Sequence, residues 1–255
     1  MIKQRKNFID RTGEEHPTNE GYSIKIIEYF DCENCTIQFT DGTLVKNTRY
    51  DHIKRGQIRN PFHKSVYGVG YTGIGNHSKW DGKKRMKKYE KWSGILERCY
   101  SEKCQIKFSS YVGALVCEEW KCFQVFGDWF ECNFDSEIMQ GWALDKDILV
   151  KGNKIYSPET CCFVPQEINN LLTKASKVRG KYPIGVHILG TKFVAQISIN
   201  KSMVHLGMFD TSEEAFYAYK LAKEDYIKEV AYKWKPYITK PCYEALYNYK
   251  VEITD

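Results

Sequence analysis

Hydrophobic and polar residues alternate in the first part of the chain. Apolar side chains recur at every second position through Ile24 and Ile26, and a similar pattern flanks the dipeptide Asp41-Gly42. Alternation of this kind is typical of half-buried strands, and Asp-Gly between two such runs is typical of a hairpin turn. We therefore predict a flexible arm over residues 1–20 and a small β barrel over residues 21–62.

A helical spacing of three and four replaces this alternation after residue 88. Tyr89, Trp92, Ile95 and Cys99 keep that spacing, and aromatic residues recur over residues 120–130. An aromatic stripe at helical spacing is typical of a buried core. We expect two such helices within a region spanning residues 89–172, after a basic, glycine-rich linker over residues 63–88.

Shorter elements are predicted after residue 141. Residues 143–149 have the pattern of a strand, Gly152-Asn153 that of a turn, and a second short strand follows. Ser157 followed by Pro158 fits the start of a helix, because serine caps helices and proline suits the first helical position. The expected order is strand, turn, strand and short helix, with Cys161 and Cys162 in the core of that helix.

Three more strands and a long helix are predicted at the end of the chain, after a basic linker over residues 173–181. The strands are expected over residues 182–188, 192–199 and 203–209. Thr211 and the two glutamates after it fit a helix start, because they cap and charge the first turn favourably. The predicted fold class is α+β with several domains, the last of which spans residues 182–255.

Charge and composition narrow the range of functions. The chain of 255 residues has 38 Lys and Arg against 32 Asp and Glu, a net charge of +6, which permits a nucleic-acid partner. Its apolar runs fall far short of the ~20 residues of a membrane helix, and the polar N-terminus lacks the apolar stretch of a secretory signal. We expect a cytoplasmic protein with no membrane partner, whose ten cysteines are thiols or metal ligands.

Two basic stretches lie between the predicted folded segments. One covers residues 79–91 and the other residues 174–181. Such stretches are either solvated surfaces or arms that follow a phosphate backbone. In the second interpretation the DNA-contacting cations are Lys83, Lys84, Arg85, Lys87, Lys88, Lys177 and Arg179.

The last predicted unit resembles a known DNA-binding domain. The motifs at residues 182–186, 192–197 and 205–215 resemble the domain of the plant Apetala and ethylene-response-factor class, which also occurs in phage and mobile-element nucleases. The resemblance implies that the exposed sheet face enters the major groove while the helix supports it from behind. The side chains that it assigns to DNA are His187, Lys192, Gln196, Ser198, Lys201, Met203 and His205. The plant domains have mostly arginine and tryptophan there, so we expect a different or weaker readout of base sequence.

The middle segment resembles phage-encoded HNH-like homing endonucleases. The matching motifs lie at residues 92–100, 116–123, 144–147 and 156–164. The resemblance implies a ββα metal site, in which Mg²⁺ or Mn²⁺ polarises a phosphate while a base activates water. The residues that it assigns are Asp145, Lys146 and Glu159 as catalytic groups and Asp145, Asp147, Asn153 and Asn169 as metal ligands. Where related nucleases have Asp-His, this chain has Asp145-Lys146, and no histidine occurs between His77 and His187.

Zinc is an alternative metal. Two cysteine pairs, Cys99 with Cys104 and Cys117 with Cys122, have four residues between their members. Most structural zinc knuckles have a gap of two residues, so this spacing is looser than usual.

Two functions therefore remain open for this sequence. The first is a double-stranded DNA-binding protein of the phage HNH-like type, acting as a Mg²⁺-dependent nickase in the cytoplasm of an infected bacterium. The second is a catalytically inactive phage protein that binds DNA or a host defence complex as a regulator or inhibitor. Lys146 in place of histidine favours the second, and the retained carboxylates and amides favour the first.

Overall fold

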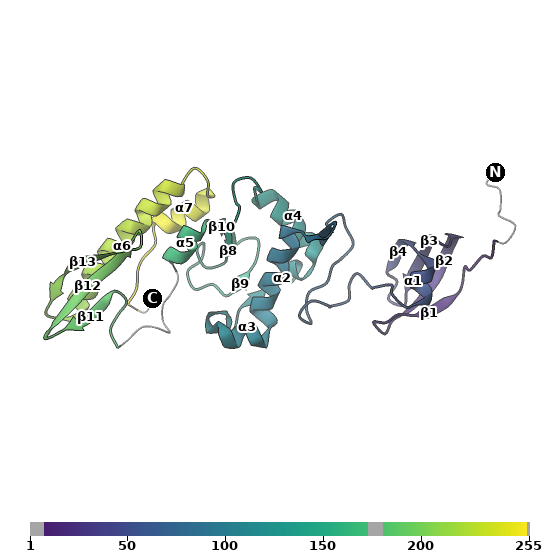
Figure 1. The fold of residues 1–255 in the computed structure, drawn as a ribbon, viewed down its shortest axis with the longest axis horizontal. Helices are drawn as coiled ribbons and strands as arrows, with labels where there is room; N and C mark the ends of the chain where they lie inside the picture. Colours follow the sequence, from purple (N-terminus) through teal and green to yellow (C-terminus); the bar gives the residue numbers. More distant parts are fainter. Residues whose placement is uncertain (1–7, 173–180, 254–255) are drawn as a thin grey trace. The chain divides into compact units, whose positions relative to one another are not determined.

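The computed structural model describes residues 8–172 and 181–253, with helices and several small sheets (Figure 1). This mixed architecture confirms the predicted α+β class. The chain divides into two compact units, one of residues 1–77 with 121–124 and one of residues 78–120 with 125–255. Within the described ranges, no helix has the length and apolar character needed to cross a membrane.

The first unit is built on an open antiparallel sheet in the order β1-β2-β3-β4. The predicted barrel is therefore wrong. After β4 the chain forms the short helix α1, and its Ile53 packs in the same core as Ile24, Ile26 and Ile37, so a helix fills the space that further strands would have filled. The bounds are β1 Glu15–Pro17, β2 Ser23–Asp31, β3 Asn34–Phe39, β4 Leu44–Thr48 and α1 Tyr50–Lys54.

The predicted arm and the predicted linker both contain regular structure. β1 lies within the segment expected to be an arm, and its residues Glu15 to Pro17 pair with β2. The segment expected to be a linker contains a two-stranded hairpin, β5 Trp80–Asp81 and β6 Lys84–Arg85, in the second unit. The paired strands have only three and two residues, so neither forms a periodic run long enough to be recognised in the sequence.

Helices in the second unit surround an aromatic core. Trp92 and Trp120 are fully buried, and the Trp92 indole N–H donates to the backbone oxygen of Trp120 at 2.7 Å. Phe163 contacts Trp129 and Phe130 through its ring. The two helices predicted from the aromatic spacing are confirmed as α2 Lys87–Tyr100 and α4 Phe123–Asn133; the segment between them contains α3 Glu102–Lys107, two single-turn 3-10 helices and β7 Leu115–Val116.

A strand pair followed by a helix forms the next part of the second unit. β8 Ala143–Asp145 pairs antiparallel with β10 Cys162–Val164, and α5 Gln166–Leu171 follows β10. β9 Ile155–Tyr156 lies between them in sequence but pairs in parallel with β7. The arrangement of β8, β10 and α5 has the strand-strand-helix order that a ββα site requires.

Two local predictions in this segment are wrong. The strand expected over residues 143–149 ends at Asp145, because the side chain of Asp145 accepts hydrogen bonds from the next backbone N–H groups and turns the chain. The helix expected at Ser157 is a single turn, in which the Ser157 backbone oxygen accepts from Thr160 and Cys161. The buried residues that follow, including Cys161 and Cys162, enter or flank strand β10 instead, and the helix begins only after Pro165.

The C-terminal part of the second unit has three antiparallel strands in the order β11-β12-β13, with α6 against one face (Figure 1). Thr211 caps α6 with the reciprocal bonds of a capping box through Glu214, as its sequence indicated. A final helix, α7, follows and was not predicted. The bounds are β11 Val186–Leu189, β12 Lys192–Ile199, β13 Ser202–Phe209, α6 Ser212–Trp234 and α7 Lys240–Tyr247.

Gly185 allows this helix to approach the sheet closely. Its φ is 77°, and a Cβ atom at this position would meet the ring of Tyr219 at 2.0 Å. Only glycine tolerates both this backbone angle and this contact at no steric cost. The glycine of the Tyr-Pro-Ile-Gly motif therefore has a packing role in the fold.

Candidate functional site

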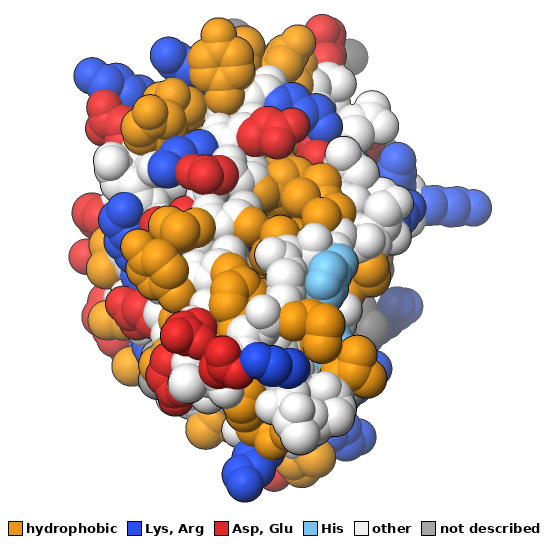
Figure 2. All heavy atoms as spheres, turned by 90° about the vertical axis from the view of Figure 1, so that its left-hand side faces the viewer, with side chains coloured by type: hydrophobic (Ala, Val, Ile, Leu, Met, Phe, Trp, Pro, Cys, Tyr) orange, Lys and Arg blue, Asp and Glu red, His pale blue; other side chains and the backbone are white. Residues whose placement is uncertain are grey.

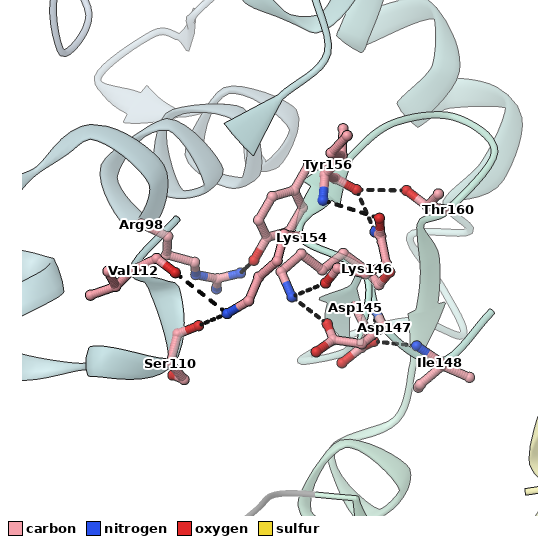
Figure 3. Close-up of polar contacts among 12 residues, drawn as sticks. Arg98, Ser110, Val112, Asp145, Lys146, Asp147, Ile148, Lys154, Tyr156 and Thr160 are labelled. Carbon is pink, nitrogen blue, oxygen red and sulfur yellow. Dashed lines mark hydrogen bonds and ion pairs between the residues drawn. The ribbon is translucent and has the colours of Figure 1, made fainter. Parts of the chain in front are cut away.

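The loop after β8 encloses the ammonium group of Lys146. Lys146 is buried, and its Nζ donates to Asp147 Oδ1 at 2.5 Å and to the Asn153 backbone oxygen at 2.9 Å (Figure 3). The ring centroid of Tyr156 lies 5.8 Å from the same nitrogen. A carboxylate, a carbonyl oxygen and an aromatic face are all partners that stabilise a cation. The Lys146 nitrogen is therefore engaged as a hydrogen-bond donor to both oxygens.

Asp145 organises the same loop through backbone contacts. Its Oδ1 accepts hydrogen bonds from the N–H groups of Asp147 at 2.8 Å and Ile148 at 3.0 Å. Burial raises the pKa of the Asp145 carboxyl, and the nearby Asp147 carboxylate acts in the same direction, while the two backbone hydrogen bonds act against them. The carboxyl group thus shapes the turn that positions Lys146.

Asn153 closes the loop with both ends of its amide. Its Nδ2 donates to the Lys146 backbone oxygen at 2.8 Å and the Ile155 backbone oxygen at 2.6 Å, and its Oδ1 accepts from the Ile155 N–H at 3.2 Å. These contacts connect the two ends of the turn. The amide therefore has a structural role at this position.

The remaining two predicted residues lie on neighbouring elements. Glu159 is exposed in the turn before β10, and a hydrogen bond with the Ser157 side chain lowers its pKa. Asn169 lies on α5. In the parts of the chain that the structure describes, no three His, Cys, Asp or Glu residues are grouped as metal ligands.

This donor set does not fit a divalent cation. Mg²⁺ requires near-octahedral oxygen ligands, whereas Asp147 Oδ1 already faces the ammonium of Lys146 and Asn153 Oδ1 faces a backbone N–H. A divalent ion at the same oxygens would also lie against a positive charge. The Lys146 side chain therefore already provides, beside these oxygens, the positive charge that a metal ion would bring.

Two further cations lie near this loop, and the sequence did not predict their contacts. Arg98 on α2 donates to the hydroxyl of Tyr156 at 3.4 Å, and Lys154 donates to the backbone oxygens of Ser110 at 2.9 Å and Val112 at 3.4 Å (Figure 3). Each contact joins residues more than forty positions apart. No short sequence signal marks such pairs.

The cysteines proposed for zinc are not grouped in the described residues. Cys122 belongs to the first unit and the other three to the second. Burial raises the pKa of Cys99 to about 12 and that of Cys117 to about 11.

The three-stranded sheet brings most of the predicted DNA-contacting side chains together. Cross-strand partners point to the same face of a sheet, and residues two apart on one strand do so as well. Gln196 pairs with His205 and Ser198 with Met203. With the pairing of β11 and β12, the register places on one face His187, Lys192, Gln196, Ser198, Met203 and His205. Ala195 and Ile197 point to the other face and are buried.

Lys201 lies at one end of this face and not on it. It forms the turn between β12 and β13 together with Asn200, and their φ values are 66° and 50°. Two consecutive residues with positive φ are typical of the tight turns that match the twist of a hairpin. The Lys201 side chain is exposed at this turn.

Charge on the sheet face is modest. The Lys192 ammonium forms an ion pair with Asp210, and Met203 and Met208 are exposed beside the polar residues. Figure 2 views this end of the second unit and shows apolar, acidic and basic side chains interspersed. The exposed side chains of this face therefore contribute little net positive charge.

The first basic stretch divides into exposed and buried cations. Lys83, Lys84, Arg85 and Lys87 are exposed on and beside the β5–β6 hairpin. Lys88 is buried, and its Nζ donates to Glu131 Oε1 at 2.6 Å, so the expectation that it contacts DNA is wrong. The predicted contacts Lys177 and Arg179 lie outside the described residues.

An open hollow lies between the end of β13 and the first turns of α6. Its volume is about 610 Å³, and its lining combines exposed aromatic and aliphatic side chains with two glutamates. The lining residues are Phe209, Glu213, Glu214, Tyr217, Ala218 and Leu221. It contains none of the site residues expected from the sequence.

Comparison with known proteins gives no relative. No protein-family model, no curated protein and no solved structure matches this chain.

Proposed function

We propose that this protein binds double-stranded DNA through the face of the β11–β13 sheet opposite α6, and that its ββα-like segment is a scaffold without nuclease activity. The observation that carries the proposal is the strand register, which places six predicted side chains on that face. A sheet fits the width of the major groove, where each base pair presents a distinct set of donors and acceptors.

The chemistry of the face suits contact with base edges. Gln196 has an amide that can bond both edge atoms of adenine, while His205 and Ser198 can each donate or accept. Lys201 at the hairpin turn is placed to reach phosphate. Because Lys192 already has an acidic partner, the electrostatic part of the binding is small.

The contacts of Lys146 support binding without cleavage. A general base must accept a proton from water, and an ammonium that donates to a carboxylate and a carbonyl cannot do so. Removal of that ammonium would leave Asp147 Oδ1 and the Asn153 backbone oxygen without this donor. The geometry therefore supports a structural role for Lys146 better than a catalytic one.

Fluorescence anisotropy with labelled duplex DNA tests the proposal. We expect Gln196→Ala combined with His205→Ala to weaken binding at least about 5-fold, the lower bound for losing one good base contact. Tyr232→Ala is the matched control, because Tyr232 is exposed on α6 and not on the sheet. Equal affinity of both variants and the wild type would contradict the assignment of the sheet, and absence of duplex binding by the wild type would contradict the function.

A further inference from the structure

The β5–β6 hairpin presents a tryptophan that the fold does not bury. Trp80 is 50% exposed, whereas the other five tryptophans of the chain are buried or half-buried. The hydroxyl of Ser78 fixes its backbone, because it donates to the Trp80 oxygen at 2.6 Å and accepts from the Trp80 N–H at 3.1 Å. The ring is therefore exposed on a positioned strand, not on a loose tail.

Cations lie against the aromatic rings at this hairpin. Trp80 pairs across the hairpin with Arg85, whose guanidinium carbon is 5.5 Å from the Trp80 ring centroid and 5.4 Å from that of Tyr89. Lys79 Nζ lies 5.7 Å from the same Tyr89 ring. Such contacts orient a cation without neutralising its charge.

The exposed cations of the hairpin have no acidic partners in the described part of the chain. Lys83, Lys84, Arg85 and Lys87 form no ion pair there, although other exposed lysines do: Lys192 pairs with Asp210, and Lys233 pairs with Glu167. Lys83 occupies the two-residue turn after Gly82, whose φ is 56°. An unneutralised group of four cations beside an exposed indole has the composition of an anion-binding surface with a stacking platform.

We propose that the β5–β6 hairpin is a binding site for single-stranded DNA, with a base stacked on Trp80 and the phosphates on Lys83, Lys84, Arg85 and Lys87. Proteins that bind single strands combine a cationic track with aromatic rings, because every base has a face that can stack. A duplex hides those faces within its own stack, so the indole is of use only for an unpaired base. The hairpin and the three-stranded sheet share no strand, so this proposal does not depend on whether the sheet binds duplex DNA.

Tryptophan fluorescence of the full chain tests this site directly. Because Trp80 is the exposed tryptophan, stacking should quench the emission when an oligothymidylate of about 15 nucleotides is added, a length within the range of single-strand sites. We expect Trp80→Ala to remove the quenching and to weaken binding in anisotropy by about 5-fold to 150-fold, the range for one base stack. Trp80→Phe should remove the quenching signal yet bind within about 5-fold of the wild type, because phenylalanine also stacks.

The contribution of the lysines to binding can be measured separately, from the salt dependence of the affinity. We expect Lys83→Gln with Lys84→Gln to reduce the slope of log affinity against log salt by about 1.4, because each phosphate contact to a single strand contributes about 0.7. Lys46→Gln with Lys54→Gln, two exposed lysines of the first unit, is the matched control and should leave the slope unchanged.

Two outcomes would overturn the inference. One is unquenched emission at saturating oligonucleotide, and the other is single-strand affinity that Trp80→Ala leaves unaltered. The duplex measurements with the Gln196 and His205 variants report on the sheet alone, so failure of the hairpin and failure of the sheet give different patterns.

Discussion

Lys88 and Lys146 are the two buried lysines among the described residues, and each has a partner that the sequence could not identify. The partner of Lys88 is Glu131, 43 positions away. Lys146 has a neighbour in sequence, Asp147, but its second contact is a backbone oxygen brought near by a turn. The sequence places these lysines among polar residues, but only the fold shows which acidic and carbonyl groups they contact.

Replacing Lys146 tests its structural role. We expect Lys146→Met to lower the free energy of unfolding by about 1–3 kcal/mol, because a buried hydrogen-bonded charge and its partners are separated. Lys154→Met is the nearby control and should cost under about 1 kcal/mol, since Lys154 is exposed. Urea unfolding monitored by circular dichroism gives both values. Equal losses would contradict the assignment of Lys146 as the internal cation of the loop.

Asp145 gives a prediction that depends on pH. Its pKa is raised above the 3.8 of an unfolded chain, so the folded state binds the proton more tightly, and its contribution to stability is lost as pH rises through the folded pKa. Asp145→Asn keeps an oxygen acceptor but removes the charge. We expect its stability relative to the wild type to increase as the pH is raised from about 4 to about 7. Unfolding midpoints at both pH values measure this, and a relative loss on going to pH 7 would contradict it.

At the scale of elements, the sequence was most informative where a strand or helix carries its own signal. β12 has the predicted bounds, and α6 begins at the predicted cap, because alternation and capping are local properties. The helix expected at Ser157 was wrong for the opposite reason. Residues Cys162 to Val164 form a strand because they pair with β8. The local sequence pattern does not predict this pairing.

The close approach of α6 to the sheet can be tested at Gly185. We expect Gly185→Ala to lower the free energy of unfolding by about 2–4 kcal/mol, because the added methyl group meets the Tyr219 ring and the backbone angle is strained. Gly190→Ala has a similar positive φ of 62° but open space around it, and should cost only about 1–2 kcal/mol. Equal losses in a thermal or urea unfolding series would show that the ring contact is unimportant.

At the scale of the whole molecule, the broad class was predictable and the divisions were less so. Mixed helices and strands follow from changes in hydrophobic period along the chain. The open first sheet did not follow, because a barrel and an open sheet that packs on α1 share the same strand pattern. The side chains of the sheet face were expected from the resemblance to the Apetala-type domain, and the strand register brings six of them to one face. Trp80 was missed although the Asp81-Gly82 dipeptide after it signals a hairpin.

A supercoiled-plasmid assay with Mg²⁺ or Mn²⁺, beside a gel shift on the same DNA, distinguishes a DNA-binding scaffold from a nuclease. We expect a shifted plasmid band that remains supercoiled, since Lys146 Nζ already donates to Asp147 and Asn153 and the loop does not fit a divalent ion. Nicking by the wild type that is lost in Asp145→Ala would contradict it and would establish a nuclease at this loop.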